Sequence, residues 1–151
     1  RPLLIEVQAL VCRTNFNLPR RTAAGTDFNR VNLLMAVLEK RVGLRLSDCD
    51  AYINVAGGMR INEPALDLSI VAAILSSYKN SSIDSKTIFF GEVGLVGEVR
   101  GVSQVETRVR EAKKLGYHTC IMPYTNVKSV DATSGIQLKG IKNVRELMDL
   151  L

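Results

Sequence analysis

The sequence predicts an α/β domain in which helices pack against a mixed sheet. Two patterns support this prediction: apolar residues alternate with a period of two in segments such as 3–12, and they recur every three or four residues in segments such as 28–42. Strand and helix segments are interleaved without strict alternation, which indicates an α/β or α+β sandwich. The 151 residues, 46% of them hydrophobic and 23% charged, fit one domain spanning 1–151 that buries a real core.

The first third of the chain contains a strand, a loop and a helix. Segment 3–12 alternates as a strand does, and segment 13–27 reads as a long polar loop of the kind that is often functional or mobile. The helix over 28–42 follows, with Thr26 or Asp27 able to cap its start and Gly43 able to end it.

The middle of the chain begins with a short strand over 51–56 that stops at Gly57-Gly58. Pro64 occupies a place that the first turn of a helix tolerates, and this helix is expected to run to about Tyr78. Segment 86–100 is predicted to hold two strands broken by glycines.

The last third continues with helices and buried strands. Ser103 and Glu106 fit a capping box that would open a helix running to about Leu115. Segments 118–123 and 136–141 read as strands, and a final helix is expected to open at 143–146 and run to Leu151.

Charge is concentrated near the N-terminus. The net charge is +5, and residues 1–41 hold seven Lys and Arg against three acidic residues. A basic segment suggests a polyanionic partner, although a solvated surface explains it as well. Arg20 and Arg21 in the long loop, with Arg30 on the next helix, could grip phosphates or form a salt-bridged loop at a subunit interface.

Several other kinds of site are not indicated. The three cysteines are far apart and show no CxxC spacing, so each is expected to be a small core residue in a reducing cytoplasm. The glycines of segment 91–101 form no phosphate-binding motif, and the single histidine, His118, is more simply a core or edge residue than a catalytic base. No run of 18 apolar residues that could span a membrane is present, and the first residues do not resemble a signal peptide.

Three segments together resemble a known family. The first contains Leu18-Pro19-Arg20-Arg21-Thr22-Ala23 and continues through Asn29-Arg30 to Ala36-Val37-Leu38-Glu39-Lys40-Arg41; the second is Asn54-Val55-Ala56-Gly57-Gly58 followed by Glu63 and Asp67-Leu68; the third is 90–100, FGEVGLVGEVR. They are similar to the C-terminal domain of the RadA (Sms) recombination proteins. That domain in turn resembles the Lon protease domain, so the resemblance implies a fold of the ribosomal protein S5 domain 2 type.

The resemblance also implies that the protease site is degenerate. The position of the Lon nucleophile falls on Ala65 or Leu66, and that of the Lon lysine falls at or near Glu106. A Ser–Lys dyad needs a hydroxyl to attack and a lysine to act as base, and these residues supply neither. Ser69, the possible substitute for the nucleophile, is expected to point elsewhere. We therefore expect no catalytic residues and no peptidase activity.

The remaining expectations come from the family. Its full-length members are hexameric ATPases that bind DNA, act with a RecA-type recombinase and drive branch migration in the cytoplasm. ATP, Mg²⁺ and Zn²⁺ are expected only in their N-terminal parts, so this domain should hold no cofactor and no metal. Sequence-independent contacts with the DNA backbone are expected from Arg13, Arg20, Arg21, Arg30, Arg60, Arg100 and Arg108, with Arg110, Lys113 and Lys114 as weaker candidates. The alternative is a hexamerisation scaffold that does not touch DNA.

Overall fold

A computed structural model describes residues 4–56, 63–130 and 135–151, and it contains two three-stranded sheets and a hairpin. The first sheet has the order β1-β3-β2, and the second, β4-β7-β8, is entirely parallel. The strands are β1 (Val7–Arg13), β2 (Arg21–Ala24), β3 (Cys49–Val55), β4 (Thr87–Phe89), β7 (Thr119–Pro123) and β8 (Gln137–Ile141), and the hairpin consists of β5 (Glu92–Val93) and β6 (Val99–Arg100).

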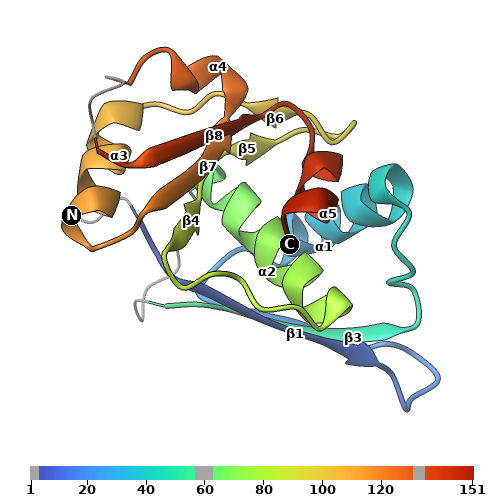
Figure 1. Cartoon of the computed structure of the whole chain (residues 1–151). Helices are drawn as coiled ribbons and strands as arrows, with labels where there is room; N and C mark the ends of the chain where they lie inside the picture. Colours follow the sequence, from blue (N-terminus) through green and yellow to red (C-terminus); the bar gives the residue numbers. More distant parts are fainter. Residues whose placement is uncertain (1–3, 57–62, 131–134) are drawn as a thin grey trace.

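Helices separate and cover these sheets. The helices are α1 (Phe28–Val37), α2 (Asp67–Lys79), α3 (Val105–Lys114), α4 (Tyr124–Val127) and α5 (Leu147–Leu150). A π-helical segment over Leu38–Val42 prolongs α1, and short 3₁₀ turns precede α2 and α5. Helix α2 lies at the centre of the molecule, between the first sheet and the second (Figure 1).

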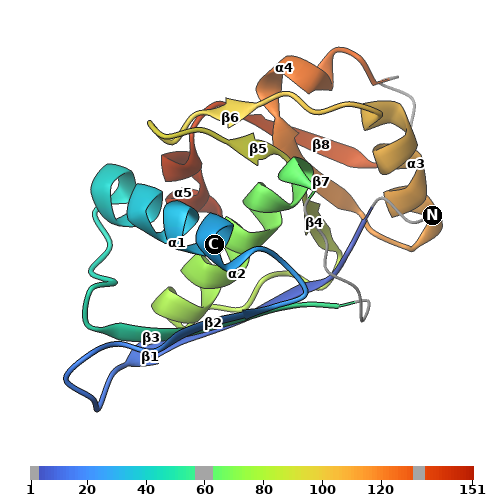
Figure 2. The same cartoon turned by 180° about the vertical axis from the view of Figure 1, so that it is seen from behind.

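The core is built around α2 because apolar side chains point from it towards both sheets. Leu68, Ile74 and Leu75 of α2 are fully buried, in one cluster with β1 and β3 residues on one side and Phe89 and Ile121 of the second sheet on the other. The opposite face of the second sheet packs under α3 in a second cluster. The molecule is therefore layered as sheet, helices, sheet, helix (Figures 1 and 2).

The first sheet has one covered face and one open face. Val7, Ala9 and Val11 of β1 turn towards α2, as the predicted alternation requires. Leu10 lies on the other face with 57% of its surface exposed, and Cys12 is exposed there too. The prediction that all three cysteines belong to the core is therefore wrong for Cys12 and confirmed for Cys49 and Cys120.

Several predicted elements are confirmed with small shifts in their bounds. Asp27 caps α1 by accepting a hydrogen bond from the Asn29 amide, and Gly43 ends its continuation with a left-handed φ of 87°. Pro64 opens the 3₁₀ turn before α2, and the last helix begins with a capping box formed by Asn143 and Glu146. These features depend on neighbours within four residues, which explains why the sequence reveals them.

Other predictions are wrong where long-range pairing decides the structure. The segment 13–27 is not all loop, because its residues Arg21–Ala24 form β2, which pairs in parallel with β3. Segment 86–100 holds three short strands instead of two, and α4 was not predicted.

The predicted capping box at the start of α3 is also wrong. The N-cap is Gln104, which has a φ of 58° and no side-chain cap, and α3 begins at Val105. Glu106 is exposed in the first turn, where a carboxylate interacts favourably with the helix dipole. The α/β fold class itself is confirmed, with a mixed first sheet and a parallel second one. None of the helices within the described residues is long and apolar enough to cross a membrane.

Candidate nucleic-acid interface

Three of the predicted contact residues gather at one end of the first sheet, beside the loop that joins β1 to β2. The pairing of β1 with β3 places Arg13 opposite Cys49, and β2 places Arg21 opposite Ala51. Residues 14–20 project beyond this end of the sheet, as Figure 1 shows at the lower right. We call Arg13, Arg20, Arg21 and the loop 14–20 the basic arm.

Arg20 is the arm's most available cation. Its guanidinium lies 3.8 Å from the centroid of the Phe16 ring, and the residue is exposed to solvent. Its backbone amide donates a hydrogen bond of 2.7 Å to Asp50, which fixes the start of β2. A guanidinium stacked on an aromatic ring keeps its edge free to donate to a phosphate.

The other two arginines of the arm differ in how far they are engaged. Arg13 is 82% exposed and its ion pair with Asp48 is long, at 3.7 Å, so solvent screens it. Arg21 is half-buried, and its guanidinium donates to the Leu46 carbonyl at 2.5 Å. Arg21 therefore anchors the arm to the segment before β3, while Arg13 and Arg20 face solvent.

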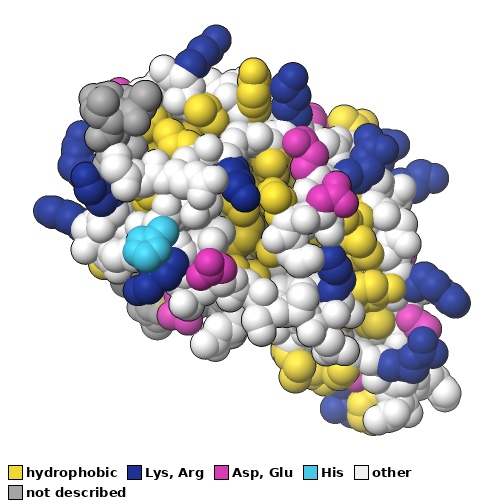
Figure 3. Space-filling model, in the orientation of Figure 1, with side chains coloured by type: hydrophobic (Ala, Val, Ile, Leu, Met, Phe, Trp, Pro, Cys, Tyr) yellow, Lys and Arg dark blue, Asp and Glu magenta, His cyan; other side chains and the backbone are white. Residues whose placement is uncertain are grey.

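Arg45 joins this group although the sequence analysis did not select it. It is exposed, and it directly precedes Leu46, which accepts the hydrogen bond from Arg21. The sequence held no signal for this, because Arg45 reaches this end of the sheet only through the antiparallel pairing of β3 with β1. Figure 3 shows basic and apolar side chains side by side at this end of the molecule, with acidic ones among them.

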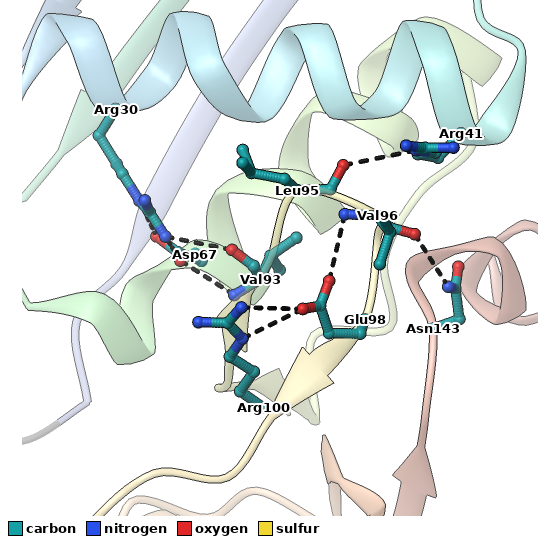
Figure 4. A network of polar contacts seen from close by, with 9 residues as sticks. All are labelled: Arg30, Arg41, Asp67, Val93, Leu95, Val96, Glu98, Arg100 and Asn143. Atoms are coloured by element: carbon teal, nitrogen blue, oxygen red, sulfur yellow. Dashed lines mark hydrogen bonds and ion pairs between the residues drawn. The ribbon is translucent and has the colours of Figure 1, made fainter.

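Arg30 does not belong to the arm. Its guanidinium forms a two-pronged ion pair with Asp67, donating to Oδ1 at 2.9 Å and to Oδ2, and it also donates to the Val93 carbonyl at 3.2 Å (Figure 4). The Asp67 carboxylate raises the pKa of Arg30, so the guanidinium stays charged. This pair ties α1, α2 and β5 together and gives Arg30 a structural role, while the expectation that Arg30 also contacts DNA stays a prediction.

Arg108 is enclosed in the structure, with only 2% of its side chain exposed. It donates to the Ser103 carbonyl at 2.9 Å and to Glu63 at 3.4 Å. Such an enclosed guanidinium cannot reach a phosphate in this conformation. The sequence carried a signal for this, since Arg108 lies on the same helical face as Val105, Val109 and Ala112.

The last two predicted contact residues are Arg100 and Arg60. Arg100 is 57% exposed and pairs with Glu98 at 2.9 Å within the hairpin. The same hydrogen bond lowers the pKa of Glu98, so the pair is charged at neutral pH. Arg60 lies outside the described residues. Of the weaker candidates, Arg110, Lys113 and Lys114 are exposed on α3, on the far side of the second sheet from the arm.

The residues that the resemblance places at a Lon-type nucleophile position carry no hydroxyl. Ala65 and Leu66 are buried in the 3₁₀ turn before α2. The Ser69 hydroxyl donates to the Phe89 carbonyl at 2.6 Å, so it is engaged in holding α2 to β4. Glu106, at the position of the lysine, is an exposed carboxylate.

Metal and thiol chemistry receive little support from the described residues. No group of three or more His, Cys, Asp or Glu that could hold a metal ion occurs in the part of the chain that the structure describes. Burial raises the pKa of the Cys120 thiol to about 12, and burial with the nearby Asp48 carboxylate raises that of Cys49. Both thiols are thus protonated and unreactive at neutral pH.

Comparison with known proteins gives two results. Residues 18–126 match the family described as subunit ChlI of Mg-chelatase. The chain is also 52% identical over 98% of its length to DNA repair protein RadA of Bacillus subtilis and 48% identical over 99% to that of Halalkalibacterium halodurans. The protein of the same name from Streptococcus pneumoniae is 45% identical over 98% of the chain.

The chain covers 32% to 35% of these relatives, so it spans about a third of the length of the RadA proteins it matches. The match with RadA agrees with the resemblance found in the three sequence segments. Because the family match spans well over half of its residues, the chain belongs to the ChlI family.

Proposed function

We propose that this chain is the DNA-binding and ring-forming module of a RadA-type DNA repair protein. The main support is that almost the whole chain aligns, at 45% to 52% identity, with proteins named DNA repair protein RadA. In this proposal the whole protein is a hexameric, cytoplasmic ATPase that acts beside a RecA-type recombinase in branch migration. ATP, Mg²⁺ and Zn²⁺ would bind to parts of it other than this chain.

The basic arm would be the DNA contact. Arg13 and Arg20 are exposed at the end of the first sheet, and Arg21 holds the arm in place. Phosphates are the appropriate target, because these cations are not arranged on a helix or ribbon that could enter a groove and read bases. The module would therefore bind DNA without regard to its sequence.

The same proposal gives the domain a Lon-type fold, of the ribosomal protein S5 domain 2 kind, without peptidase activity. The lack of peptidase activity is supported by two observations: Ala65 and Leu66 carry no hydroxyl, and the Ser69 hydroxyl is already hydrogen-bonded. A nucleophile needs both an attacking atom and a base within hydrogen-bond reach, and Glu106 is no replacement for a neutral lysine.

A scaffold that does not touch DNA is the second candidate, and a specific observation favours it. Arg30 and Arg108 are engaged inside the chain, and Arg100 pairs with Glu98. Only part of the predicted cationic set is therefore available for phosphates.

Replacing Arg20 and Arg21 together by alanine tests the DNA contact. Each phosphate contact that is lost should lower the slope of log K against log salt by about 1. The variant should therefore bind a duplex more weakly at low salt and respond less to added salt. Fluorescence anisotropy with a labelled duplex at several salt concentrations measures both quantities.

The matched control removes two charges from exposed positions elsewhere, Lys40→Ala with Lys128→Ala. A general effect of net charge would weaken both variants equally. Wild-type affinity and slope in the Arg20/Arg21 variant would instead remove the arm from the DNA site and leave the scaffold.

A further inference from the structure

The turn that joins β5 to β6 exposes two large aliphatic side chains. Leu95 is 64% exposed and Val96 is 54% exposed, although neighbouring hairpin residues such as Val93 and Val99 are buried. We call residues 94–97 the hairpin tip. An exposed aliphatic pair at the end of a hairpin is a place where burial by a partner would be favourable.

The backbone of the hairpin tip is fixed by hydrogen bonds from two surrounding segments and from Glu98 of the hairpin itself. The Leu95 carbonyl accepts from Arg41 and the Val96 carbonyl from Asn143, both at 3.4 Å, while the Val96 amide donates to Glu98 at 3.2 Å (Figure 4). The Val144 amide also donates to Gly97 at 2.8 Å. The two side chains are therefore presented by an ordered backbone, which reduces the entropy lost when a partner covers them.

A cavity of about 210 Å³ lies at the other end of α1, where α1 and α2 begin. The cavity has an apolar wall formed by Pro64, Leu66 and Ile70. The carboxylates of Glu63 and Glu92 also line it. A cavity of about 150 Å³ takes up a molecule the size of benzene, so this one has room for a leucine side chain. Of the other charged residues in its lining, Arg30 and Asp67 pair with each other, and Asp27 caps α1.

The chain's own tip is held away from this cavity. Arg41, which bonds the tip, follows Arg30, which lines the cavity, by 11 residues of continuous helix, a rise of roughly 16 Å. The hydrogen bonds from Arg41 and Asn143 keep the tip at the far end. The tip of the same chain therefore does not line the cavity.

We propose that the hairpin tip of one copy of this chain inserts into the cavity of the next copy. Charge supports the match: exposed Arg41 lies beside the apolar tip, where Arg100 and Glu98 offset each other, and the cavity is lined by the carboxylates of Asp27, Glu92 and Glu63, of which Glu63 pairs with Arg108. Because the two surfaces are different, the contact is head-to-tail, and contacts of this type close into rings when the rotation permits. The inference rests on the self-association in the proposed function and assigns residues to it.

Sedimentation of the complete chain over a range of concentrations tests the role of the tip. Leu95→Asp places a charge in the proposed contact, so self-association should weaken by about tenfold or more. Leu115→Asp is the matched control, because Leu115 is 61% exposed but lies after α3, far from both surfaces. Equal behaviour of the two variants, or a wild-type chain that stays monomeric throughout, overturns the proposal.

A photoreactive amino acid at position 95 tests the cavity as the receiving surface. A mixture of unlabelled photoreactive chain and ¹⁵N-labelled ordinary chain is irradiated and digested, and mass spectrometry identifies the linked peptides. Links from position 95 to the labelled segment 63–70 are expected. Links only to another segment, or only to unlabelled peptide of the same molecule, overturn it.

The two proposals can fail separately. If Leu95→Asp dissociates the assembly while the Arg20/Arg21 variant binds DNA normally, the DNA contact fails and the head-to-tail contact stands. If Leu95→Asp leaves the assembly unchanged while the Arg20/Arg21 variant loses DNA binding, the reverse holds.

Discussion

At the scale of single residues, the pair of Arg30 and Asp67 determines how three elements meet. Asp67 is 2% exposed at its side chain and accepts from Arg30 and from the Val93 amide at 3.0 Å. A carboxylate buried to this extent is tolerated only when charge and hydrogen bonds compensate for its lost hydration. The start of α2 and the base of the hairpin are consequently positioned by one ion pair.

Replacing Arg30 by alanine should therefore lower the free energy of unfolding by about 2–3 kcal/mol, because the buried Asp67 carboxylate loses its cation. Urea denaturation followed by circular dichroism measures this loss. Arg100→Ala is the comparison, since its ion pair with Glu98 is exposed and should contribute less than about 1 kcal/mol. Similar losses in the two variants would show that the buried pair contributes no more than an exposed one.

At the scale of elements, the short strand β2 decides where the basic arm lies. It pairs in parallel with β3 over four residues, and Gly25 directly after it allows the chain to turn into α1. Gly25 has a φ of 82°, and a Cβ there would lie 2.2 Å from the Val55 carbonyl oxygen. A close approach of two backbones thus fixes the geometry between the arm and the first helix.

Gly25→Ala should lower the free energy of unfolding by about 3 kcal/mol or more, since it adds a backbone clash to left-handed strain. Gly43→Ala provides the control, because Gly43 has a similar φ of 87° but nothing lies within 4 Å of its missing Cβ. That variant should lose only about 1–2 kcal/mol. Thermal melts of both chains compare them, and equal losses would mean that the approach to Val55 has no energetic consequence.

At the scale of the whole molecule, α2 is shared by both sheets. It packs against β1 on one side and against β4 and β5 on the other, and its residues from Leu68 to Leu75 are almost all buried (Figure 2). Neither sheet can keep its covered face without this helix. The domain should therefore unfold as one unit despite having two apolar clusters.

Ile74→Ala should lower stability by about 2–5 kcal/mol, because Ile74 is fully buried and its truncation leaves a cavity. The free energy of opening should fall by the same amount for the slowest-exchanging amides of β3 and of β7. Native-state hydrogen exchange measures this free energy at each amide. A loss confined to β3 would show that the second sheet with α3 is an independent unit.

The candidate site was only partly predictable because burial and availability are tertiary properties. Arg20 and Arg21 were correctly recognised as neighbours in one segment, but only the fold separates the exposed Arg20 from the anchored Arg21. Arg30 and Arg108 look the same in a list of cations. Their partners in the fold, Asp67 for Arg30 and Glu63 for Arg108, are 37 and 45 residues away.

The sequence by itself determined the α/β class, the helices α1 and α2 with the cap at the start of α1, and the resemblance to RadA, because each depends on local periodicity or on residues within a motif. The tertiary structure alone decided that Arg21–Ala24 is a strand, that Arg30 pairs with Asp67, that Arg108 is buried, and that the hairpin tip and the cavity are different surfaces. The physical reason is that strand pairing and charge burial depend on contacts between segments far apart in the chain. A local sequence pattern does not reveal the free energies of such contacts.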